Sequence, residues 1–185
     1  NSFAICYLHA CRDAGHEQAT ADLVRAAMPE AYVCLSSDVF PQIKEYERVS
    51  TTAVNAYVGP ALERYLSRLE ERLGEAGYRG PVLIILSHGG VAPIAEAIRL
   101  AAATVLSGPA GGVAGARYAA QLMDAPDLIP FDMGGTSTDI SLIAGGEATL
   151  SADRGIAGQR IALQALDIAS IGAGGGSLAH VDAKH

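Results

Sequence analysis

The segment LIPFDMGGTSTDISLI, from Leu128 to Ile143, decides how we interpret this sequence. A first apolar run ends at Asp132, a turn follows through Gly134 and Gly135, and a second apolar run begins after Asp139. The pattern predicts two strands joined by a tight turn. An ordinary β-hairpin with a Gly-Gly turn and polar decoration would have the same pattern.

The tip of this hairpin carries the groups that a phosphate–Mg²⁺ complex requires. Glycines let backbone N–H groups approach a ligand closely. Three hydroxyl side chains follow them, Thr136, Ser137 and Thr138, and each can donate a hydrogen bond to an anionic oxygen. Asp132 and Asp139 stand on either side, and each offers the oxygen ligands that a divalent cation prefers. We therefore expect the hairpin to bind phosphate.

Composition narrows the class of protein. The chain has 185 residues, of which 50% are apolar and 18% charged, so we expect a folded domain with a sizeable core. The net charge is −7 and basic residues do not cluster, which argues against a nucleic-acid partner. No apolar run is long enough to cross a membrane. The three cysteines show no CxxC spacing, which indicates free thiols in a reducing, cytoplasmic compartment.

Apolar periodicity predicts alternating strands and helices, hence an α/β fold. We expect strands at 3–8, 32–35, 81–86, 148–150 and 161–168, and helices at 17–28, 45–73, 94–100 and 107–120. In the long helix, the apolar stripe from Tyr46 to Leu69 is expected to face the core. Pro60 is expected to kink or break this helix near Val58 and Gly59.

The run PVLIIL at 81–86 is continuously apolar, as is typical of a strand buried on both faces. Ser87 and His88 follow at its carboxyl end, where ligands bind in open α/β sheets. They are candidates to contact a substrate. A turn with a surface histidine is an equal alternative.

Two further stretches are rich in glycine. The helix predicted at 107–120, SGPAGGVAGARYAA, has a face with almost no side-chain bulk, which indicates close packing against another element or a ligand. The run SIGAGGGS at 170–177 places Gly174, Gly175 and Gly176 in a second loop suited to a nucleotide cleft. Neither a dinucleotide fingerprint nor a Walker A motif occurs.

These motifs match a known family. LSGPAGGVAGA (106–116), FDMGGTSTDISLI (131–143) and IGAGGGSLA (171–179) resemble the hydantoinase A/5-oxoprolinase family, which includes the A component of N-methylhydantoinase and the acetone carboxylase β subunit. CYLHACRDAGHE (6–17), EYERVSTTAVNAYVGP (45–60) and ILSHGG (85–90) agree with it, so the resemblance covers nearly the whole chain.

The resemblance implies the ribonuclease-H-like fold of the actin, chaperone and sugar-kinase ATPases, with ATP and Mg²⁺ in a cleft between two lobes. Residues 1–106 would form the end of the first lobe, and residues 107–185 the crossing helix and the start of the second. Asp132 would lie at the Mg²⁺ ion. Asp139 would orient the loop hydroxyls or act on phosphoryl transfer, and capping of the strand turn is an equal alternative. Residues Gly134, Gly135, Thr136, Ser137 and Thr138 would contact phosphates, and Gly174, Gly175 and Gly176 would close near the nucleotide.

Two departures from the superfamily pattern matter. The chaperones carry Asn-Glu-Pro-Thr where this chain has Ser107-Gly108-Pro109-Ala110, so the role of their glutamate is vacant. The first phosphate loop of the family, of the type Asp-Ile-Gly-Gly-Thr, does not occur in the sequence. We therefore expect these residues to be part of a longer protein.

The function implied by the resemblance is ATP-dependent hydrolysis of a cyclic amide, hydantoin or 5-oxoproline, with Asp132 and Asp139 as catalytic residues. Ser87 and His88 would lie near the substrate, and a hydantoinase B-type subunit would be the partner. Two alternatives are ATP-dependent activation of a ketone, as in the acetone carboxylase β subunit, and a non-catalytic actin-like module.

Overall fold

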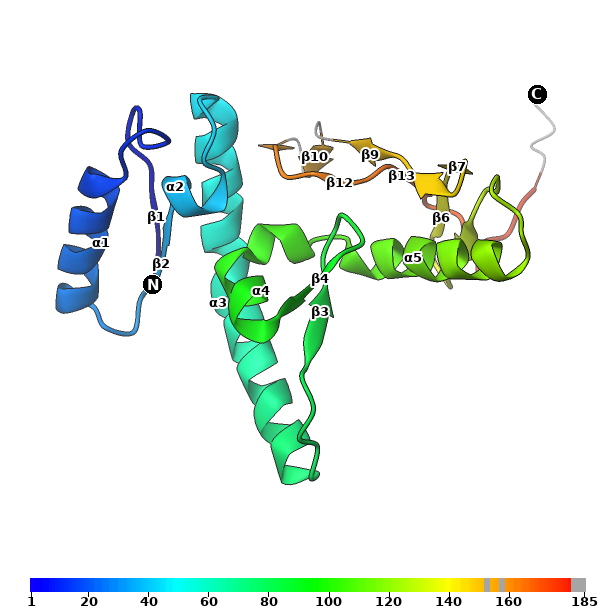
Figure 1. Cartoon of the computed structure of the whole chain (residues 1–185), viewed down its shortest axis with the longest axis horizontal. Coiled ribbons are helices and arrows are strands. Elements are labelled where there is room, and N and C mark those ends of the chain that lie inside the picture. Colours follow the sequence, from blue (N-terminus) through cyan, green and yellow to red (C-terminus); the bar gives the residue numbers. More distant parts are fainter. Residues whose placement is uncertain (152–153, 157–158, 181–185) are drawn as a thin grey trace.

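The computed structural model describes residues 1–151, 154–156 and 159–180. Figure 1 shows an N-terminal α/β region around a long helix, and a C-terminal region in which one helix lies beside short strands. The helices are α1 (Gly15–Ala27), α2 (Ser36–Val39), α3 (Glu45–Glu75), α4 (Ile94–Arg99), the 3₁₀ helix η1 (Ala101–Thr104) and α5 (Ser107–Leu122). The strands are β1 (Ser2–Ile5), β2 (Tyr32–Leu35), β3 (Leu83–Ile85), β4 (Val91–Pro93), β5 (Phe131–Met133), β6 (Thr138–Ser141), β7 (Ile143–Ala144), β8 (Glu147–Ala148), β9 (Leu150–Ser151), β10 (Arg154–Ile156), β11 (Gln159–Ile161), β12 (Ala165–Leu166) and β13 (Ile168–Ile171).

The N-terminal region begins with a βαβ unit. Strands β1 and β2 pair in parallel, and α1 connects them. Ile5, Ala21 and Leu35 form a small core between the strands and α1. Cys34 and Ala56 belong to a second core between the strands and α3. The sheet therefore lies between two helices, as the alternating pattern predicted.

Helix α3 differs from the prediction in two ways. It runs as one helix from Glu45 to Glu75, so Pro60 does not break it, and the kink stays a prediction. The tyrosines of the expected apolar stripe are exposed, since Tyr57 is 86% exposed and Tyr46 and Tyr65 are more than half exposed. Its C-terminal end faces the core as predicted, because Leu69, which is partly buried, packs on the core around Leu66.

The buried face of α3 is instead mostly small or polar. It includes Arg48, Ser50, Thr51, Thr52, Asn55, Ala56, Gly59 and Leu66. Asn55 shows why polar residues suit this position, since its side chain bonds to the hydroxyl of Tyr32, the carbonyl of Arg99 and the amide of Ala102. A Cβ on Gly59 would lie 2.2 Å from the ring of Tyr32. Glycine before Pro60 also removes the Cβ that would clash with the proline ring, which helps the helix continue.

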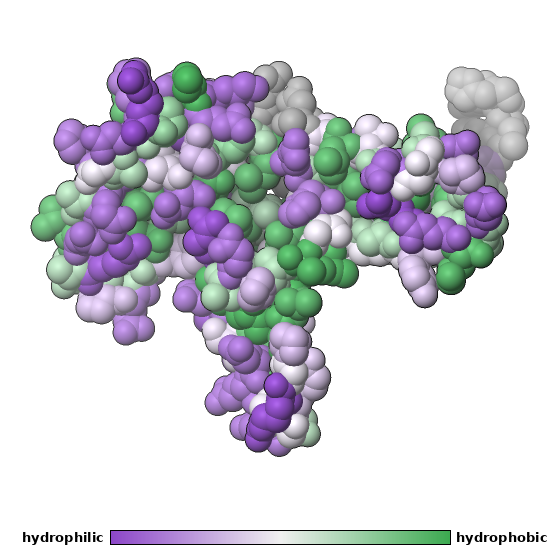
Figure 2. All heavy atoms as spheres, in the orientation of Figure 1, coloured by the Kyte–Doolittle hydropathy of each residue, from purple (hydrophilic) through white to green (hydrophobic). Residues whose placement is uncertain are grey.

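Strand β3 is not the fully buried strand that the run at 81–86 predicted. In the described residues it pairs only with β4, antiparallel, and Leu83 and Ile85 are 52% and 39% exposed. Ile84, by contrast, packs on the core formed by Leu66 and Ala97. The expectation is wrong because the run alternates between a covered and an open face. Figure 2 shows apolar side chains on the surface over β3 and β4.

In the C-terminal region, α5 packs against short antiparallel strands. Ala110 and Val113 of α5 form a core with Ile143 and Leu166. Strands β13, β6 and β5 form a three-stranded sheet in that order, and β9 pairs with β12, in the two stretches where the sequence predicted strands. No helix in the described part of the chain is long and apolar enough to span a membrane.

The N-terminal and C-terminal regions are in direct contact. The amide of Ala162 donates to the hydroxyl of Thr51 over 3.1 Å, and the amide of Leu166 donates to the carbonyl of Ser87 over 2.8 Å. The division into lobes at residues 106 and 107 stays a prediction.

Candidate phosphate-binding site

The segment from Leu128 to Ile143 forms the predicted hairpin. Strand β5 pairs antiparallel with β6, and Met133 lies opposite Thr138. The amide of Gly134 donates to the carbonyl of Ser137 over 2.9 Å, which closes the turn. Gly134, Gly135 and Thr136 are exposed, so their backbone and hydroxyl groups are accessible to a ligand.

The second glycine loop lies directly on this tip. The amides of Gly175 and Gly176 donate to the carbonyls of Gly134 and Gly135 over 2.9 and 3.0 Å. A Cβ on Gly174 would lie 2.7 Å from both the carbonyl oxygen of Gly134 and the amide nitrogen of Thr136. Only glycine fits at this position. The structure thus joins the two glycine runs, which are distant in the sequence, into one unit.

Thr138 has a structural contact that its place in the motif did not reveal. Its side chain is fully buried, and its hydroxyl donates to the carbonyl of Ala173 over 2.6 Å. Ser177 also braces the second loop, because its hydroxyl accepts from the amide of Gly174 over 3.0 Å. The hydroxyl of Thr138 therefore holds the loops together, whereas Thr136 and Ser137 lie nearer the surface.

Two carboxylates face each other at the base of the hairpin. Asp132 on β5 is the direct cross-strand neighbour of Asp139 on β6. Like charges in this position are unfavourable. Asp132 has no hydrogen bond or ion pair to any described residue, and neither acid has a basic partner there. A divalent cation between the two would offset the repulsion, so the acids fit such an ion.

The described residues contain no cluster of three or more histidine, cysteine or acidic side chains that would enclose a metal. A cation at Asp132 and Asp139 would therefore take its remaining ligands from phosphate oxygens and water, which is usual for Mg²⁺.

A small cavity separates the carboxylates from helix α5. Its volume is about 210 Å³, and Gly112, Asp132 and Asp139 are among its lining residues. A Cβ on Gly112 would lie 3.4 Å from Oδ2 of Asp132, so glycine keeps this space open. The expected close packing of α5 occurs at Gly111, where a Cβ would lie 3.1 Å from the side chain of Ile85. Gly115 has open space beside it.

Ser87 and His88 lie elsewhere. Ser87 is buried, and its hydroxyl donates to the carbonyl of Gln164 over a long 3.5 Å contact. His88 is exposed. Neither lines the cavity beside Asp132. The structure thus places Ser87 where the two regions of the chain meet, and leaves His88 accessible.

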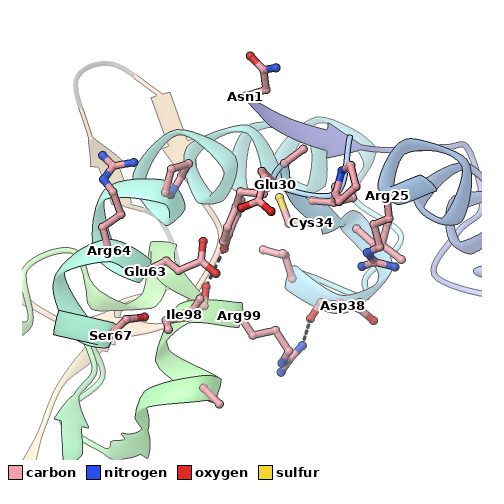
Figure 3. Close-up of a pocket in the computed structure, with 18 of the residues that line it drawn as sticks. Asn1, Arg25, Glu30, Cys34, Asp38, Glu63, Arg64, Ser67, Ile98 and Arg99 are labelled. Carbon is pink, nitrogen blue, oxygen red and sulfur yellow. Dashed lines mark hydrogen bonds between the residues drawn. The ribbon is translucent and has the colours of Figure 1, made fainter. Parts of the chain in front are cut away.

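A larger cavity, about 950 Å³, runs along β2 and is shown in Figure 3. Two of its polar side chains are paired, because Tyr32 donates to the carbonyl of Ile98 and Arg99 donates to the carbonyl of Asp38. Burial raises the pKa of Tyr32 to about 12 and that of Cys34 to about 11. Both groups are therefore neutral at physiological pH, and neither is an effective acid or base there.

A buried polar cluster near β1 was not foreseen from the sequence. Glu17 is fully buried and accepts hydrogen bonds from Ser36, Ser37 and the amide of Tyr7. Burial alone would raise the pKa of Glu17, but these hydrogen bonds outweigh it and hold the pKa below its usual value. Arg48, also buried, donates to the carbonyls of Gln42 and Tyr7. The cluster fixes the turn after β1 against α3.

Two solved structures have the same fold over almost all of this chain. Nucleotide-free acetone carboxylase matches with a TM-score of 0.82 at 30% identity, over 99% of this chain and 26% of that chain. ATP-dependent caprolactamase from Pseudomonas jessenii matches with a TM-score of 0.85 at 39% identity, over the same shares. The predicted α/β class is confirmed, and the fold is that of part of an ATPase-like enzyme.

Sequence comparisons define the family. The profile of the Hydantoinase/oxoprolinase family matches residues 48–185. The alpha chain of the P. jessenii caprolactamase is 40% identical, over 97% of this chain and 26% of its own length. The 5-oxoprolinase of Saccharomyces cerevisiae is 34% identical, over 96% of this chain and 14% of its own length. The chain belongs to the Hydantoinase/oxoprolinase family, as its motifs indicated, and spans about a quarter or less of these relatives.

Proposed function

We propose that this chain supplies the phosphate-handling part of an ATP-dependent hydrolase that opens a cyclic amide such as hydantoin, 5-oxoproline or caprolactam. The observation that carries the proposal is the joined pair of glycine loops beside the opposed carboxylates Asp132 and Asp139. Relatives named caprolactamase and 5-oxoprolinase support the reaction class.

In this proposal the hairpin tip binds the β- and γ-phosphates of ATP. The exposed amides around Gly134 and Gly135 and the hydroxyls of Thr136 and Ser137 donate to phosphate oxygens. Asp132 would hold Mg²⁺ directly or through its water shell, and the ion would supply positive charge next to the phosphates. Asp139 acts beside it on the phosphoryl transfer. Gly174, Gly175 and Gly176 hold the tip in shape, and Thr138 contributes through its contact with Ala173.

ATP is required because an amide resists attack by water. Transfer of the γ-phosphoryl group to the amide oxygen releases ADP and makes that oxygen a leaving group. Water then adds to the ring carbon and the C–N bond opens, which leaves an acyl phosphate and a free amine. A second water hydrolyses the acyl phosphate to a carboxylate and inorganic phosphate. His88 is the accessible candidate for the substrate side, and Ser87 precedes it in a position fixed by backbone bonds to Ala103 and Leu166.

Assembly with a second protein and a cytoplasmic location belong to the same proposal. Several relatives are named as subunits, among them the alpha chain of caprolactamase and the beta chain of acetone carboxylase, which supports assembly with a hydantoinase B-type subunit. Cys6, Cys11 and Cys34 are all free thiols, which supports a reducing compartment.

Ketone activation is the second candidate. The beta chain of acetone carboxylase from Xanthobacter autotrophicus is 31% identical over 96% of this chain. The two reactions share ATP and differ in the acceptor oxygen, an amide or a ketone. Phosphate release by the complete protein, measured with each cyclic amide and with acetone, separates them. Binding of Mg·ATP without turnover of any acceptor would instead favour a non-catalytic module.

A further inference from the structure

We infer that Ser170 is a positioning residue, which holds the carboxylate of Asp139 beside Asp132 and thereby sets how tightly the pair binds a divalent cation. The inference rests on the proposed function and adds to it a residue outside the hairpin. Ser170 belongs to β13, which is one edge strand of the three-stranded sheet, and Asp132 belongs to β5, which is the other edge strand.

Three residues form one row across the three-stranded sheet. Ser170 is the cross-strand neighbour of Asp139, and Asp139 is the neighbour of Asp132. Directly opposed residues project from the same face of a sheet. Ile168, two residues before Ser170 on the same strand, lines the cavity with both acids, so this face is turned toward α5.

The hydroxyl of Ser170 donates to Oδ1 of Asp139 over a short 2.5 Å contact. This bond fixes the rotation of the carboxylate and leaves Oδ2 available to another ligand. Ser170 and Asp132 lie on the strands on either side of β6, so the bond anchors Oδ1 on the β13 side and holds the carboxylate in one orientation before a cation arrives.

The hydrogen bond has a simpler structural explanation, namely that it only strengthens the pairing of β13 with β6. The two explanations differ in what the hydroxyl controls. A purely structural bond changes the stability of the fold and leaves cation affinity alone. A positioning bond changes cation affinity, since groups that orient a metal ligand typically contribute about 10- to 100-fold in affinity.

The experiment measures Mn²⁺ binding by electron paramagnetic resonance in the complete protein, with Mn²⁺ alone as the probe. Ser170→Ala is compared with Ser170→Thr, which keeps a hydroxyl on a strand, and with Asp132→Asn, which removes a ligand. We expect Ser170→Ala to weaken binding about tenfold, Ser170→Thr to restore it, and Asp132→Asn to abolish it. The Mg²⁺ concentration for half-maximal ATP hydrolysis should rise by the same factor in Ser170→Ala, with the rate at saturating Mg²⁺ little changed.

Unchanged Mn²⁺ affinity in Ser170→Ala, with binding lost in Asp132→Asn, would overturn the inference and leave the proposed function standing. Absence of Mn²⁺ binding by the unmodified protein would overturn it as well. If Ser170→Ala weakens Mn²⁺ binding but the unmodified protein hydrolyses no ATP, the positioning role of Ser170 is supported and the proposed function is contradicted.

Discussion

Gly174 lies against the backbone of Thr136 so closely that a Cβ on the glycine would be 2.7 Å from the amide nitrogen of the threonine. This contact joins the two glycine loops, and no side chain can be added without moving one of them. The shape of the hairpin tip therefore depends on a residue distant from it in the sequence.

Replacing Gly174 with alanine should separate the loops. We expect a loss of roughly 1–3 kcal/mol in the free energy of unfolding, which is typical of overpacking, together with weaker ATP binding. Urea unfolding and nucleotide titration measure the two effects. Gly172→Ala is the matched control in the same loop, because its Cβ would meet nothing within 4 Å. Equal effects from the two substitutions would contradict the contact.

Replacing Asp132 with asparagine should abolish ATP hydrolysis with little change in stability. The side chain is exposed and has no partner among the described residues, so the fold does not depend on its charge. Asp167→Asn, an exposed acid in the same region, is the control and should retain activity. Phosphate release and thermal melting provide the measurements. ATP turnover by Asp132→Asn at the rate of the unmodified protein would show that Asp132 is not part of the site.

Replacing Gly112 with leucine should block the site more than it destabilises the fold. The new side chain would fill the cavity of about 210 Å³ beside Asp132, where a Cβ alone would make only ordinary contact. Gly115→Leu, one turn further along α5, points into open space and serves as control. We expect ATP hydrolysis to be lost only in Gly112→Leu. Normal turnover in that variant would show that the cavity is not used.

The finding that the small and polar face of α3 is buried can be tested by measuring the stability of variants. Asn55→Ala removes three buried hydrogen bonds and should cost roughly 2–4 kcal/mol in the free energy of unfolding. Tyr57→Ala removes a side chain that is 86% exposed and should change stability little. A larger loss in Tyr57→Ala than in Asn55→Ala would mean that the apolar stripe is the buried face after all.

The buried carboxylate of Glu17 should make stability depend on pH. Its folded-state pKa is lowered, so the carboxylate stabilises the fold above its ordinary pKa of about 4.5, and that stability is lost as the pH falls through the folded value. Glu17→Gln should lose stability at pH 7 and show a smaller further loss on acidification. Urea unfolding at pH 7 and in the acid range tests this, and identical pH profiles would contradict it.

The sequence was most informative where a pattern is local. The hairpin and the helix beginning at Ser107 both follow from glycine positions and apolar periodicity. The prediction of which face of α3 is buried failed. Periodicity shows that a helix has an apolar stripe, but it does not show whether neighbouring loops supply hydrogen-bond partners for the polar face. The exposed side of β3 was missed for a related reason, since a continuous apolar run does not reveal which side is covered.

At the candidate site, the sequence identified the two glycine runs but not the contact between them. Nothing in a run of three glycines distinguishes Gly174, which touches Thr136, from its neighbours. The row of Ser170, Asp139 and Asp132 depends on strand register, which chain order alone does not give. Ser170 is the first residue of the run at 170–177, two positions before its first glycine, and that position was the one available signal.

The most direct test of the central claim is ATP hydrolysis by the complete protein with Mg²⁺, measured as phosphate release with and without hydantoin, 5-oxoproline, caprolactam or acetone. The account predicts that one cyclic amide stimulates phosphate release and is itself opened, and that Asp132→Asn abolishes both. Stimulation by acetone alone would move the assignment to ketone activation. Absence of ATP turnover with every compound would contradict the proposed function.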